Sequence, residues 1–566
     1  MPPILNKIMN YKQHIAKKIK LEGFSFDEIL SNIVSATEAT HGDYSLPCFS
    51  FAKALKKSPI VIANEIKESF TLDKYIQRVE VIAGYVNFFL ERKSFIESFL
   101  TEYNKNGAPF ASLKANNKTI CIDYSSINIA KPFHIGHLLT TAIGGSLYRI
   151  FSHLGYTVVG INHLGDYGTQ FGKLISAYKR WGDKKQVEEG GITALTTLYV
   201  RFHDEAKNDK SLEDEARKYF LDIENGNKEA MELFNWFKEL TMLEVEKVYK
   251  RLGVVFDSYD GEAFYNDKMQ PVIDVLNEKN LLTVSEGAKV VDLEQFDMPP
   301  CLILKSDGAS LYATRDLAAA MYRKNKYNFD KNLYVVAYQQ NLHFKQVFQT
   351  LELMGYDWAP DCVHVPFGMV SLEGGLSMST REGRVVYLSD VLQTAVDKTL
   401  TIIKEKNPTL GQEEKALIAE KVGVGAVVFM ALSSSKIKDL VFSYDRALNF
   451  DGETAPYIQY THTRCRSILA KSSGVATAET DKLTDDDSFA IIKMLSKFDD
   501  IVTTSAIKYE PSILAKYLID ICQLFNKYYS NHKILGDSSR EALTSIVALA
   551  LKKGLSLLLI DAPDRM

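Results

Sequence analysis

Two histidines that flank a glycine have the spacing best suited to chemistry in this sequence. His134 and His137 stand on either side of Gly136, between an apolar run at 120–124 that predicts a buried strand and an apolar spacing at 135–147 that predicts a helix. A helix start carries unpaired N–H groups and the positive end of the dipole, so it favours an anionic phosphate. The imidazoles can donate hydrogen bonds as charge develops there, and the glycine lets a flat base approach the backbone. These features predict nucleotidyl transfer.

The position of this motif in the chain matters, because histidines near a helix start are often only caps and the motif alone is weak. Further apolar runs at 156–162, 332–338 and 362–371 predict strands that alternate with helical segments. That alternation is typical of an α/β fold with a parallel sheet. Gln340 and His343 follow the run at 332–338, and ligands bind at the carboxyl ends of such strands.

The bulk composition is that of an ordinary globular protein. The 566 residues predict three or four domains, and a net charge of −4 neither indicates nor excludes a local basic face for nucleic acid. The six cysteines contain no C-x-x-C pair, which argues against a structural zinc site and is typical of a reduced cytosol. The longest apolar run, 422–432, is too short to span a membrane. We expect a cytoplasmic protein without a membrane partner.

The block SSINIAKPFHIGHLLTTAIGG resembles the signature of class I aminoacyl-tRNA synthetases and, within them, of the arginyl-tRNA synthetases. The resemblance runs from residue 40 to residue 566. It implies an α/β multidomain protein with a Rossmann-type parallel-sheet catalytic domain that carries insertions, an α+β N-terminal domain and an all-α C-terminal anticodon-binding domain. The other strings that match are THGDYSLPCFSFAKALKKSP, GYVNFFL, DRALNFDGETAPYIQYTHTRCRSIL and KGLSLLLIDAPDRM.

Three domains are expected from this resemblance. Residues 1–110 would bind the tRNA elbow, residues 115–400 would be catalytic, and residues 411–566 would be helical throughout and bind the anticodon. The catalytic domain would contain insertions near 182–252 and 262–308. The apolar helical stripe in the first insertion is interpreted as core packing.

The resemblance implies an arginine–tRNA ligase. ATP, as a substrate with Mg²⁺, would activate L-arginine to arginyl-adenylate, and the arginyl group would pass to the 3′ end of tRNA(Arg). No covalent enzyme intermediate is required, so positioning and charge stabilisation would supply the catalysis. We expect no metal site made by the protein itself, and a monomer.

Carboxylates, amides and a phenol would hold the substrate guanidinium, a planar cation with five donors. Asp123 stands where relatives often carry glutamate, and Ile127 replaces the proline usual before the next residue. The arginine-binding residues that the resemblance implies are Asp123, Asn128, Tyr312, Asp316 and Gln340.

The string SMSTREG resembles a degenerate form of the second class I signature, in which Ser377 and Thr380 replace lysines. We expect Lys131 to supply the missing charge on the triphosphate, with Arg381 as the rival source. The catalytic residues implied are His134, Gly136, His137, Lys131 and Arg381. The ATP-binding residues implied are His134, Gly136, His137, His343, Met378 and Ser379. The tRNA-binding residues implied are Tyr85, for base stacking, and Asn87, for a base edge.

Two other classes of protein remain as alternatives. A small nucleotidyltransferase can carry the same histidine motif, but the long helical C-terminal region argues against it. A non-enzymatic RNA-binding protein derived from a synthetase is disfavoured by the intact His134, His137, Tyr312 and Asp316. The absence of an editing-sized insertion is consistent with arginine, because a pocket built on charge pairs rejects misfits without editing.

Overall fold

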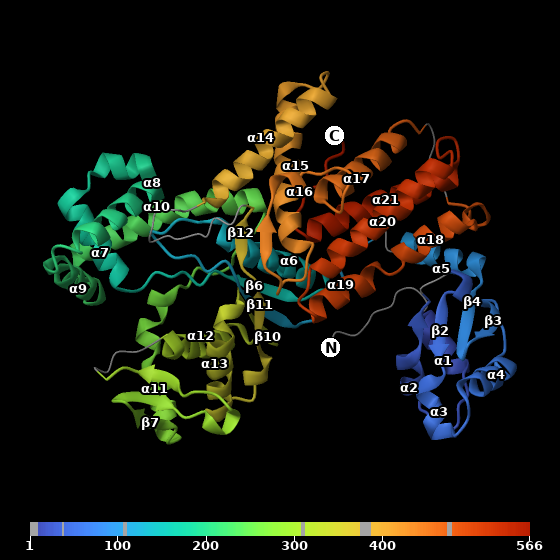
Figure 1. Ribbon diagram of the computed structural model, residues 1–566, viewed down its shortest axis with the longest axis horizontal. Helices are drawn as coiled ribbons and strands as arrows, with labels where there is room; N and C mark the ends of the chain where they lie inside the picture. The colour runs from blue at the N-terminus through green and yellow to red at the C-terminus, as the bar shows by residue number, and fades with distance from the viewer. Residues whose placement is uncertain (1–9, 37–38, 106–109, 307–311, 374–385, 473–477) are drawn as a thin grey trace. The chain divides into compact units, whose positions relative to one another are not determined.

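The computed structural model describes residues 10–36, 39–105, 110–306, 312–373, 386–472 and 478–566 (Figure 1). These residues form two compact units. The first unit is drawn from residues 1–111, 464–501 and 520–550, and the second from residues 112–463, 502–519 and 551–566. The second unit contains the parallel sheet and both histidines of the motif.

A four-stranded sheet, whose strand pairs are all parallel, forms the centre of the second unit. Its spatial order is β11-β10-β5-β6. The chain order reverses between β5 and β10, and in open α/β sheets ligands bind outside the carboxyl ends of strands at such a point. The sheet confirms the expected α/β fold. Its strands are β5 (Thr119–Asp123), β6 (Thr157–Ile161), β10 (Lys331–Ala337) and β11 (Cys362–Phe367).

The single strand predicted over 362–371 is two strands. β11 ends at Phe367, and β12 (Val370–Leu372) pairs with β13 (Leu440–Phe442) in a separate two-stranded parallel ladder. The break falls at Gly368, where an added Cβ would meet the backbone of Lys438. A neighbouring segment therefore crosses too closely for the first strand to continue.

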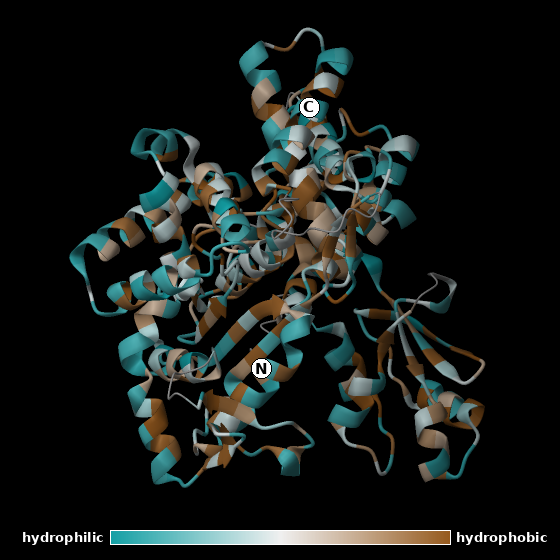
Figure 2. Cartoon of the chain, turned by 60° about the vertical axis from the view of Figure 1, so that its left-hand side comes forward, coloured by the Kyte–Doolittle hydropathy of each residue, from teal (hydrophilic) through white to brown (hydrophobic). Residues whose placement is uncertain are grey.

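Helices cover both faces of the parallel sheet (Figure 1). α6 (Leu138–His153) packs on one face, so closely that an added Cβ at Gly144 would collide with the ring of Tyr124. α12 (Tyr312–Tyr327) and α13 (Asn341–Leu353) lie side by side on the other face. The hydropathy colours in Figure 2 place brown on the strands and inner helix faces and teal on the outer faces, as burial of apolar surface requires.

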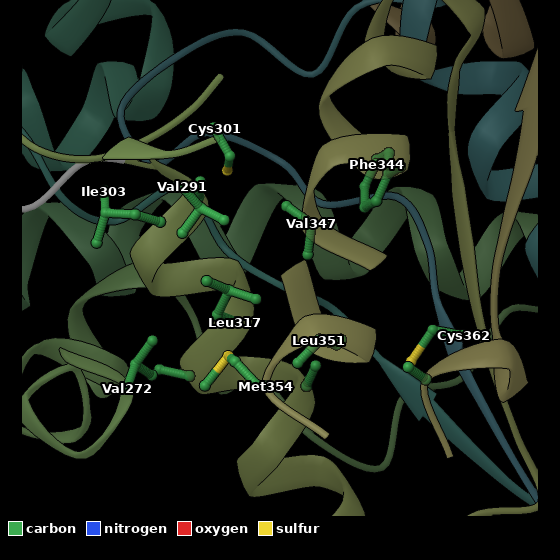
Figure 3. Close-up of a cluster of buried hydrophobic side chains, with 14 of the residues drawn as sticks. Val272, Val291, Cys301, Ile303, Leu317, Phe344, Val347, Leu351, Met354 and Cys362 are labelled. Atoms are coloured by element: carbon green, nitrogen blue, oxygen red, sulfur yellow. The ribbon is translucent and has the colours of Figure 1, made fainter. Parts of the chain in front are cut away.

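The second insertion shares a hydrophobic core with α12 and α13. Figure 3 shows Val272 and Val291 of the insertion pointing at Leu317, Val347 and Leu351 of those helices, all five buried. The shared core therefore packs the second insertion against α12, the helix that carries Asp316. Its elements are η3 (Glu262–Lys268), α11 (Gln270–Glu278), β7 (Leu282–Ser285), β8 (Ala288–Val291), η4 (Glu294–Phe296) and β9 (Cys301–Leu304).

The first insertion is helical, as expected, and most of the chain beyond residue 386 is helical as well. That region is not helical throughout, because β13 interrupts it. α7 (Thr169–Trp181) leads into the first insertion, whose helices are α8 (Lys184–Glu205), α9 (Ser211–Glu224) and α10 (Lys228–Leu252). The later helices are α14 (Leu388–Lys406), α15 (Gln412–Leu432), α16 (Tyr444–Ala447), α17 (Ala455–Leu469), α18 (Asp486–Leu495), α19 (Phe498–Ile507), α20 (Ser512–Asn531) and α21 (Ser538–Leu557). Within the described ranges, no helix is long and apolar enough to cross a membrane.

The N-terminal part of the first unit is α+β, which confirms that expectation. A four-stranded antiparallel sheet of order β1-β2-β4-β3 packs with short helices. Its strands are β1 (Val34–Ser35), β2 (Tyr44–Pro47), β3 (Ile76–Ile82) and β4 (Tyr85–Leu90). Its helices are α1 (Tyr11–Lys18), α2 (Phe26–Asn32), α3 (Phe49–Leu55), α4 (Pro59–Ser69) and α5 (Arg92–Lys105). In the same unit, α5 contacts α18 through the rings of Phe95 and Phe489, whose centroids are 5.5 Å apart.

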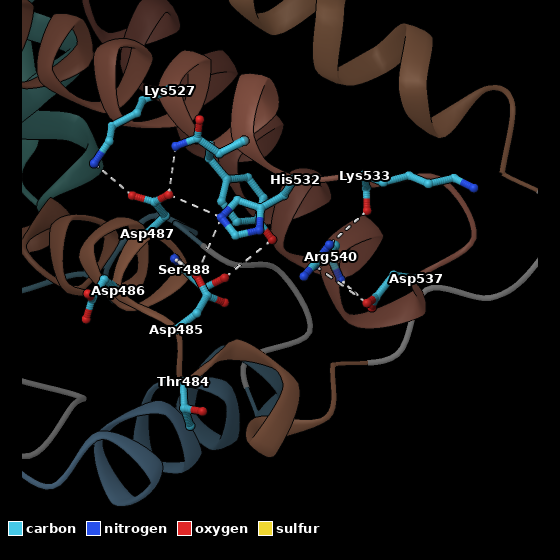
Figure 4. A network of polar contacts seen from close by, with 12 residues as sticks. Thr484, Asp485, Asp486, Asp487, Ser488, Lys527, His532, Lys533, Asp537 and Arg540 are labelled. Atoms are coloured by element: carbon cyan, nitrogen blue, oxygen red, sulfur yellow. Dashed lines mark hydrogen bonds and ion pairs between the residues drawn. The ribbon is translucent and has the colours of Figure 1, made fainter.

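A polar network ties the first turn of α18 to the end of α20 in this unit (Figure 4). The carboxylate of Asp487 accepts hydrogen bonds from Lys527 at 2.9 Å and from Asn531 and His532 at 3.1 Å each. The hydrogen bond from Lys527 is the largest cause that lowers the pKa of Asp487, to about 2. The folded state therefore binds the charged carboxylate more favourably than the unfolded chain does.

Replacing Asp487 with asparagine should lower the free energy of unfolding by ~1–2 kcal/mol at neutral pH, because one ion pair and its hydrogen bonds are lost. The native pKa lies below that of the unfolded chain, so the loss should persist above about pH 4 and shrink as the pH falls toward 2. Denaturant unfolding across this range measures it. Asp486→Asn is the matched control, since that neighbouring side chain is 88% exposed and solvent screens its ion pair with Arg92. Equal losses in both variants would contradict the assignment.

Candidate active site at the carboxyl ends of β5 and β10

The loop that leaves β5 has an unusual backbone. Ser125, Ser126 and Ala130 all have positive φ, at 69°, 44° and 58°, a conformation that costs about 1–3 kcal/mol for a residue other than glycine. The loop is held on both sides: the N–H of Ser125 donates to Thr140 Oγ1 of α6 at 3.0 Å, and the carbonyl of Ile127 accepts from the next loop along the sheet, at 2.8 Å. Such over-determined strain is typical of functional sites.

His134 and His137 cap the start of α6, as the simpler interpretation of the motif predicted. A 3-10 turn, η2 (Ile135–His137), precedes the helix, and the N–H of Gly136 donates to His134 Nδ1 at 3.1 Å. A backbone N–H can only donate, so this Nδ1 is the acceptor and the proton of the neutral ring lies on Nε2. The N–H of His134 in turn lies 3.3 Å from His137 Nδ1. The cap therefore orients His134 with Nε2–H as its outward donor.

Both imidazoles are neutral near pH 7. Burial lowers the pKa of His134. Burial, with a contribution from neighbouring His134, lowers the pKa of His137 to about 3. Neutral rings whose centroids are 4.1 Å apart do not repel each other. They can still donate N–H groups to phosphate oxygens, in the way an oxyanion hole does.

The segment that follows the second predicted signature lies against the histidines. The N–H of Ile135 donates to the carbonyl of Val386 at 3.0 Å, and that of Leu388 donates to the carbonyl of Phe133 at 2.9 Å. On the other side of the signature, the N–H of Glu373 donates to Phe442 at 3.0 Å. Both flanks of the signature are thus anchored. The signature residues predicted to act are Met378, Ser379 and Arg381. They lie outside the described residues, as do Ser377 and Thr380, which stand where the lysines would be.

Tyr312 and Asp316 both lie on α12, one turn apart, so they share a helix face. Tyr312 is the first residue of the helix and is 69% exposed. The Oδ2 of Asp316 lies 2.6 Å from Nε2 of His343, one of the predicted ATP-binding residues. Burial raises the pKa of Asp316, but the hydrogen bond from His343 and the charges of His343, His163 and Arg323 outweigh it and hold the pKa below its ordinary value. Asp316 is an anion here.

Glu262, at the start of η3, is a candidate that sequence reasoning missed. Burial is the largest cause that raises its pKa to about 7, and the charges of Asp316 and Asp166 add to it. Arg315 and Lys131 act in the opposite direction. Glu262 titrates near pH 7 because charging it is costly when it is buried beside another acid. A bound cation would stabilise its charged form. No local motif marked Glu262, because only the fold brings η3 next to α12.

Comparison with known proteins decides the family. The model for "tRNA synthetases class I (R), catalytic domain" matches residues 98–444. An "Arginyl tRNA synthetase N terminal domain" model matches residues 9–90, and a "DALR anticodon binding domain" model matches residues 458–566. The chain belongs to the arginyl-tRNA synthetase family.

Relatives of this family match over nearly the whole chain. An arginine–tRNA ligase of Alkaliphilus metalliredigens is 47% identical over 98% of this chain and 100% of the relative. One of Clostridioides difficile is 49% identical over 97% and 98%. The arginyl-tRNA synthetase structure of Thermus thermophilus superposes with a TM-score of 0.80 at 25% identity, covering 94% of this chain and 96% of that one. The sequence-based resemblance is confirmed.

Asp123, which is predicted to bind arginine, is already paired in the structure. Its Oδ2 accepts from Arg323 Nη2 at 2.8 Å, and its Oδ1 accepts from Ser126 Oγ at 2.7 Å. Asp123 is 5% exposed and Arg323 is 1% exposed, so the ion pair is fully buried. Sequence reasoning missed Arg323, which lies in the polar C-terminal part of α12. A role for Asp123 in arginine binding stays a prediction, and any contact would be added to this pair.

The remaining catalytic-domain positions lie at the same edge of the sheet. Asn128 is exposed on the loop after β5, with its backbone bridged to Gly165 of the loop after β6. Gln340 is exposed at the end of η5 (Tyr338–Gln340), directly after β10. Lys131 is half-buried on the loop that leads to the histidines. Their roles stay predictions, but the fold brings them together.

Of the two predicted tRNA contacts, the structure supports only one as accessible. Tyr85 begins β4, is 40% exposed, and its ring lies 5.2 Å from the ring of exposed Phe49. Asn87 is 2% exposed, and its Oδ1 accepts from Ser45 Oγ at 2.7 Å. Asn87 is two residues from Tyr85 and so shares its face of β4, but its amide is covered and its oxygen accepts from Ser45; that Asn87 reads a base edge stays a prediction.

Gly165→Ala should weaken arginine binding. An added Cβ would collide with Oδ1 of Asn128, so that side chain must move away from its position. If Asn128 holds arginine, the KM for arginine should rise about tenfold, the cost of one hydrogen bond to a charged group, while the KM for ATP stays near wild type. Gly411→Ala is the control, since its Cβ would meet no atom within 4 Å. An unchanged KM for arginine in Gly165→Ala would remove Asn128 from the site.

Proposed function

We propose that this chain activates L-arginine with ATP and transfers the arginyl group to the 3′ end of tRNA(Arg), using the site between β5 and β10. The function agrees with the relatives named arginine–tRNA ligase, which are 47–49% identical over nearly their full length. The arginine carboxylate attacks the α-phosphate of ATP, giving arginyl-adenylate and pyrophosphate. A terminal ribose hydroxyl of the tRNA then takes the arginyl group and releases AMP.

One observation carries this proposal: an acidic pair stands at the same sheet edge as a helix cap made of neutral N–H donors. Asp316 and Glu262 offer two carboxylates to a guanidinium, with Tyr312 and Gln340 nearby in the fold. The cap at His134 offers donors to a phosphate. A substrate that is cationic at one end and reacts with a phosphate at the other matches both.

Magnesium enters this proposal with the nucleotide. No group of three or more histidine, cysteine, aspartate or glutamate side chains that could hold a metal occurs in the described part of the chain. We assign Mg²⁺ to the phosphates of ATP, as the family resemblance implies. Lys131 is proposed to add positive charge there.

The tRNA is proposed to contact the helical region, which carries the anticodon-binding model, and the N-terminal domain around Tyr85. We retain the predicted domain ranges 1–110, 115–400 and 411–566 as part of this proposal. We also propose a monomer in the cytoplasm. The six cysteines are all buried with free thiols, which fits a reducing compartment.

Pyrophosphate exchange with each of the twenty amino acids, with and without tRNA(Arg), tests the proposed function. Of the twenty amino acids, only arginine should support exchange. The exchange should be much faster with tRNA than without it, as the family resemblance implies. Exchange with a different amino acid would overturn the substrate. Absence of exchange with every amino acid would favour the non-enzymatic alternative.

Substitutions at His134 can separate the roles of its two ring nitrogens. His134→Asn keeps an acceptor near the position of Nδ1, so it should preserve the cap but lose the Nε2–H donor. We expect its kcat for exchange to fall about 10²–10³-fold, as for the loss of one oxyanion donor. His134→Gln, which places a donor near Nε2, should retain more activity. The reverse order of the two variants would show that His134 is only a cap.

Glu262 should make arginine binding depend on pH. Its pKa is raised to about 7, so a fall in pH below that value protonates it and removes a negative charge facing the guanidinium. The KM for arginine should therefore rise as the pH drops from about 8 to about 6. Glu262→Gln should raise the KM and flatten this profile, whereas Asp267→Asn, on the exposed side of η3, should do neither. A profile unchanged by Glu262→Gln would exclude Glu262.

A further inference from the structure

One face of α10 contacts the loops of the candidate site. The apolar stripe of this insertion predicts only core packing. Lys238, Thr241, Val245 and Tyr249 follow each other at helical spacing on this face. Val245 is apolar and packs in the core, 1% exposed. The other three each bond a loop at the carboxyl end of the sheet.

Tyr249 makes the connection that reaches the histidines. Its hydroxyl lies 2.8 Å from Ser125 Oγ and 2.9 Å from Asn162 Nδ2. Ser125 Oγ lies 2.9 Å from Thr141 Oγ1, which donates to the carbonyl of His137 at 2.7 Å. All four side chains that precede this carbonyl are buried, between 0% and 3% exposed.

The direction of every bond in this chain follows from the donors available. The amide nitrogen of Asn162 can only donate, so the oxygen of Tyr249 accepts from it. The carbonyl of His137 can only accept, so the single proton of Thr141 is committed to it. Ser125 must then donate to Thr141, which leaves Tyr249 to donate to Ser125. The proton of Tyr249 is thus donated to Ser125.

Two further attachments come from the same face. Thr241 Oγ1 accepts from the N–H of Ala130 at 3.0 Å, at one of the positive-φ residues of the loop. Lys238 Nζ lies 2.7 Å from Asp166 Oδ2, on the loop after β6. The strained loop is therefore bonded to α10 near both of its ends, at Ser125 and at Ala130.

We infer that Tyr249 is a positioning residue for adenylate formation, whose hydroxyl, through Ser125 and Thr141, fixes the loop after β5 and the carbonyl of His137. The inference rests on the proposed function for its kinetic consequence. Strain in the loop makes this fixing necessary, because left-handed serines relax once the bonds that hold them are lost. The loop carries Asn128 and leads to Lys131, so its displacement misplaces groups at the reacting phosphate.

The kinetic test compares Tyr249→Phe with the wild type in pyrophosphate exchange with arginine and tRNA. Phenylalanine keeps the ring and removes only the hydroxyl. The kcat should fall about tenfold, which corresponds to ~1.4 kcal/mol, while the KM for ATP stays within about twofold. Ser125→Ala should produce a similar fall, and the double variant should be little worse than either single one, because both break the same chain. Tyr356→Phe is the control: its hydroxyl lies 3.7 Å from Met321 Sδ, on the segment that leads to the start of β11.

A second measurement does not depend on the reaction. Amide hydrogen exchange over residues 124–138, without substrates, should be faster in Tyr249→Phe than in the wild type and unchanged in Tyr356→Phe. A wild-type kcat in Tyr249→Phe, an equal fall in Tyr356→Phe, or unchanged amide exchange would overturn the inference. If the wild-type chain exchanges no pyrophosphate with arginine, the proposed function fails, and the amide exchange alone decides whether Tyr249 positions the loop.

Discussion

The cap at the start of α6 is the interaction on which this site depends. The N–H of Gly136 donates to His134 Nδ1, so the ring is fixed and its Nε2 carries the proton. The helix behind the cap cannot shift to suit a ligand, because it is buried along nearly its whole length. It is also bonded to the end of the chain, since Ser146 Oγ donates to the carbonyl of Leu557 at 2.9 Å. A rigid helix with a fixed cap is a preorganised donor, the kind of group that stabilises developing charge best.

Opposite electrostatic demands meet at this one sheet edge. The phosphate side needs hydrogen-bond donors that do not repel each other. Burial lowers the pKa of both histidines there, so their imidazoles are neutral. The guanidinium side needs negative charge, and the contact with His343 keeps Asp316 ionised despite its burial. The pKa of Glu262 is raised to about 7, so the charge of this group responds to an arriving cation. The buried pair Asp123–Arg323 lies at the end of β5 and adds no net charge of its own.

The parts of this molecule that follow from local pattern could be predicted. The apolar runs at β5 and β10 are mostly buried, so their composition marks them as parallel strands. The start of α6 follows from apolar spacing and from the motif itself. The division of 362–371 into two strands could not be foreseen, because it arises from the close approach of Lys438 at Gly368. The site shows the same limit of local pattern: Glu262 and Arg323 stand in helical segments with no motif, and only tertiary packing brings them to Asp316 and Asp123.

The tautomer of His134 tests the account most directly. Nitrogen-15 NMR of the imidazoles can be recorded on protein labelled only at histidine, with His134→Gln used to assign the signal. Between about pH 6 and 8 the ring should be neutral with its proton on Nε2, and that signal should shift when a non-hydrolysable ATP analogue binds. A proton on Nδ1, or a charged ring at neutral pH, would contradict the cap and with it the donor proposed for the phosphate.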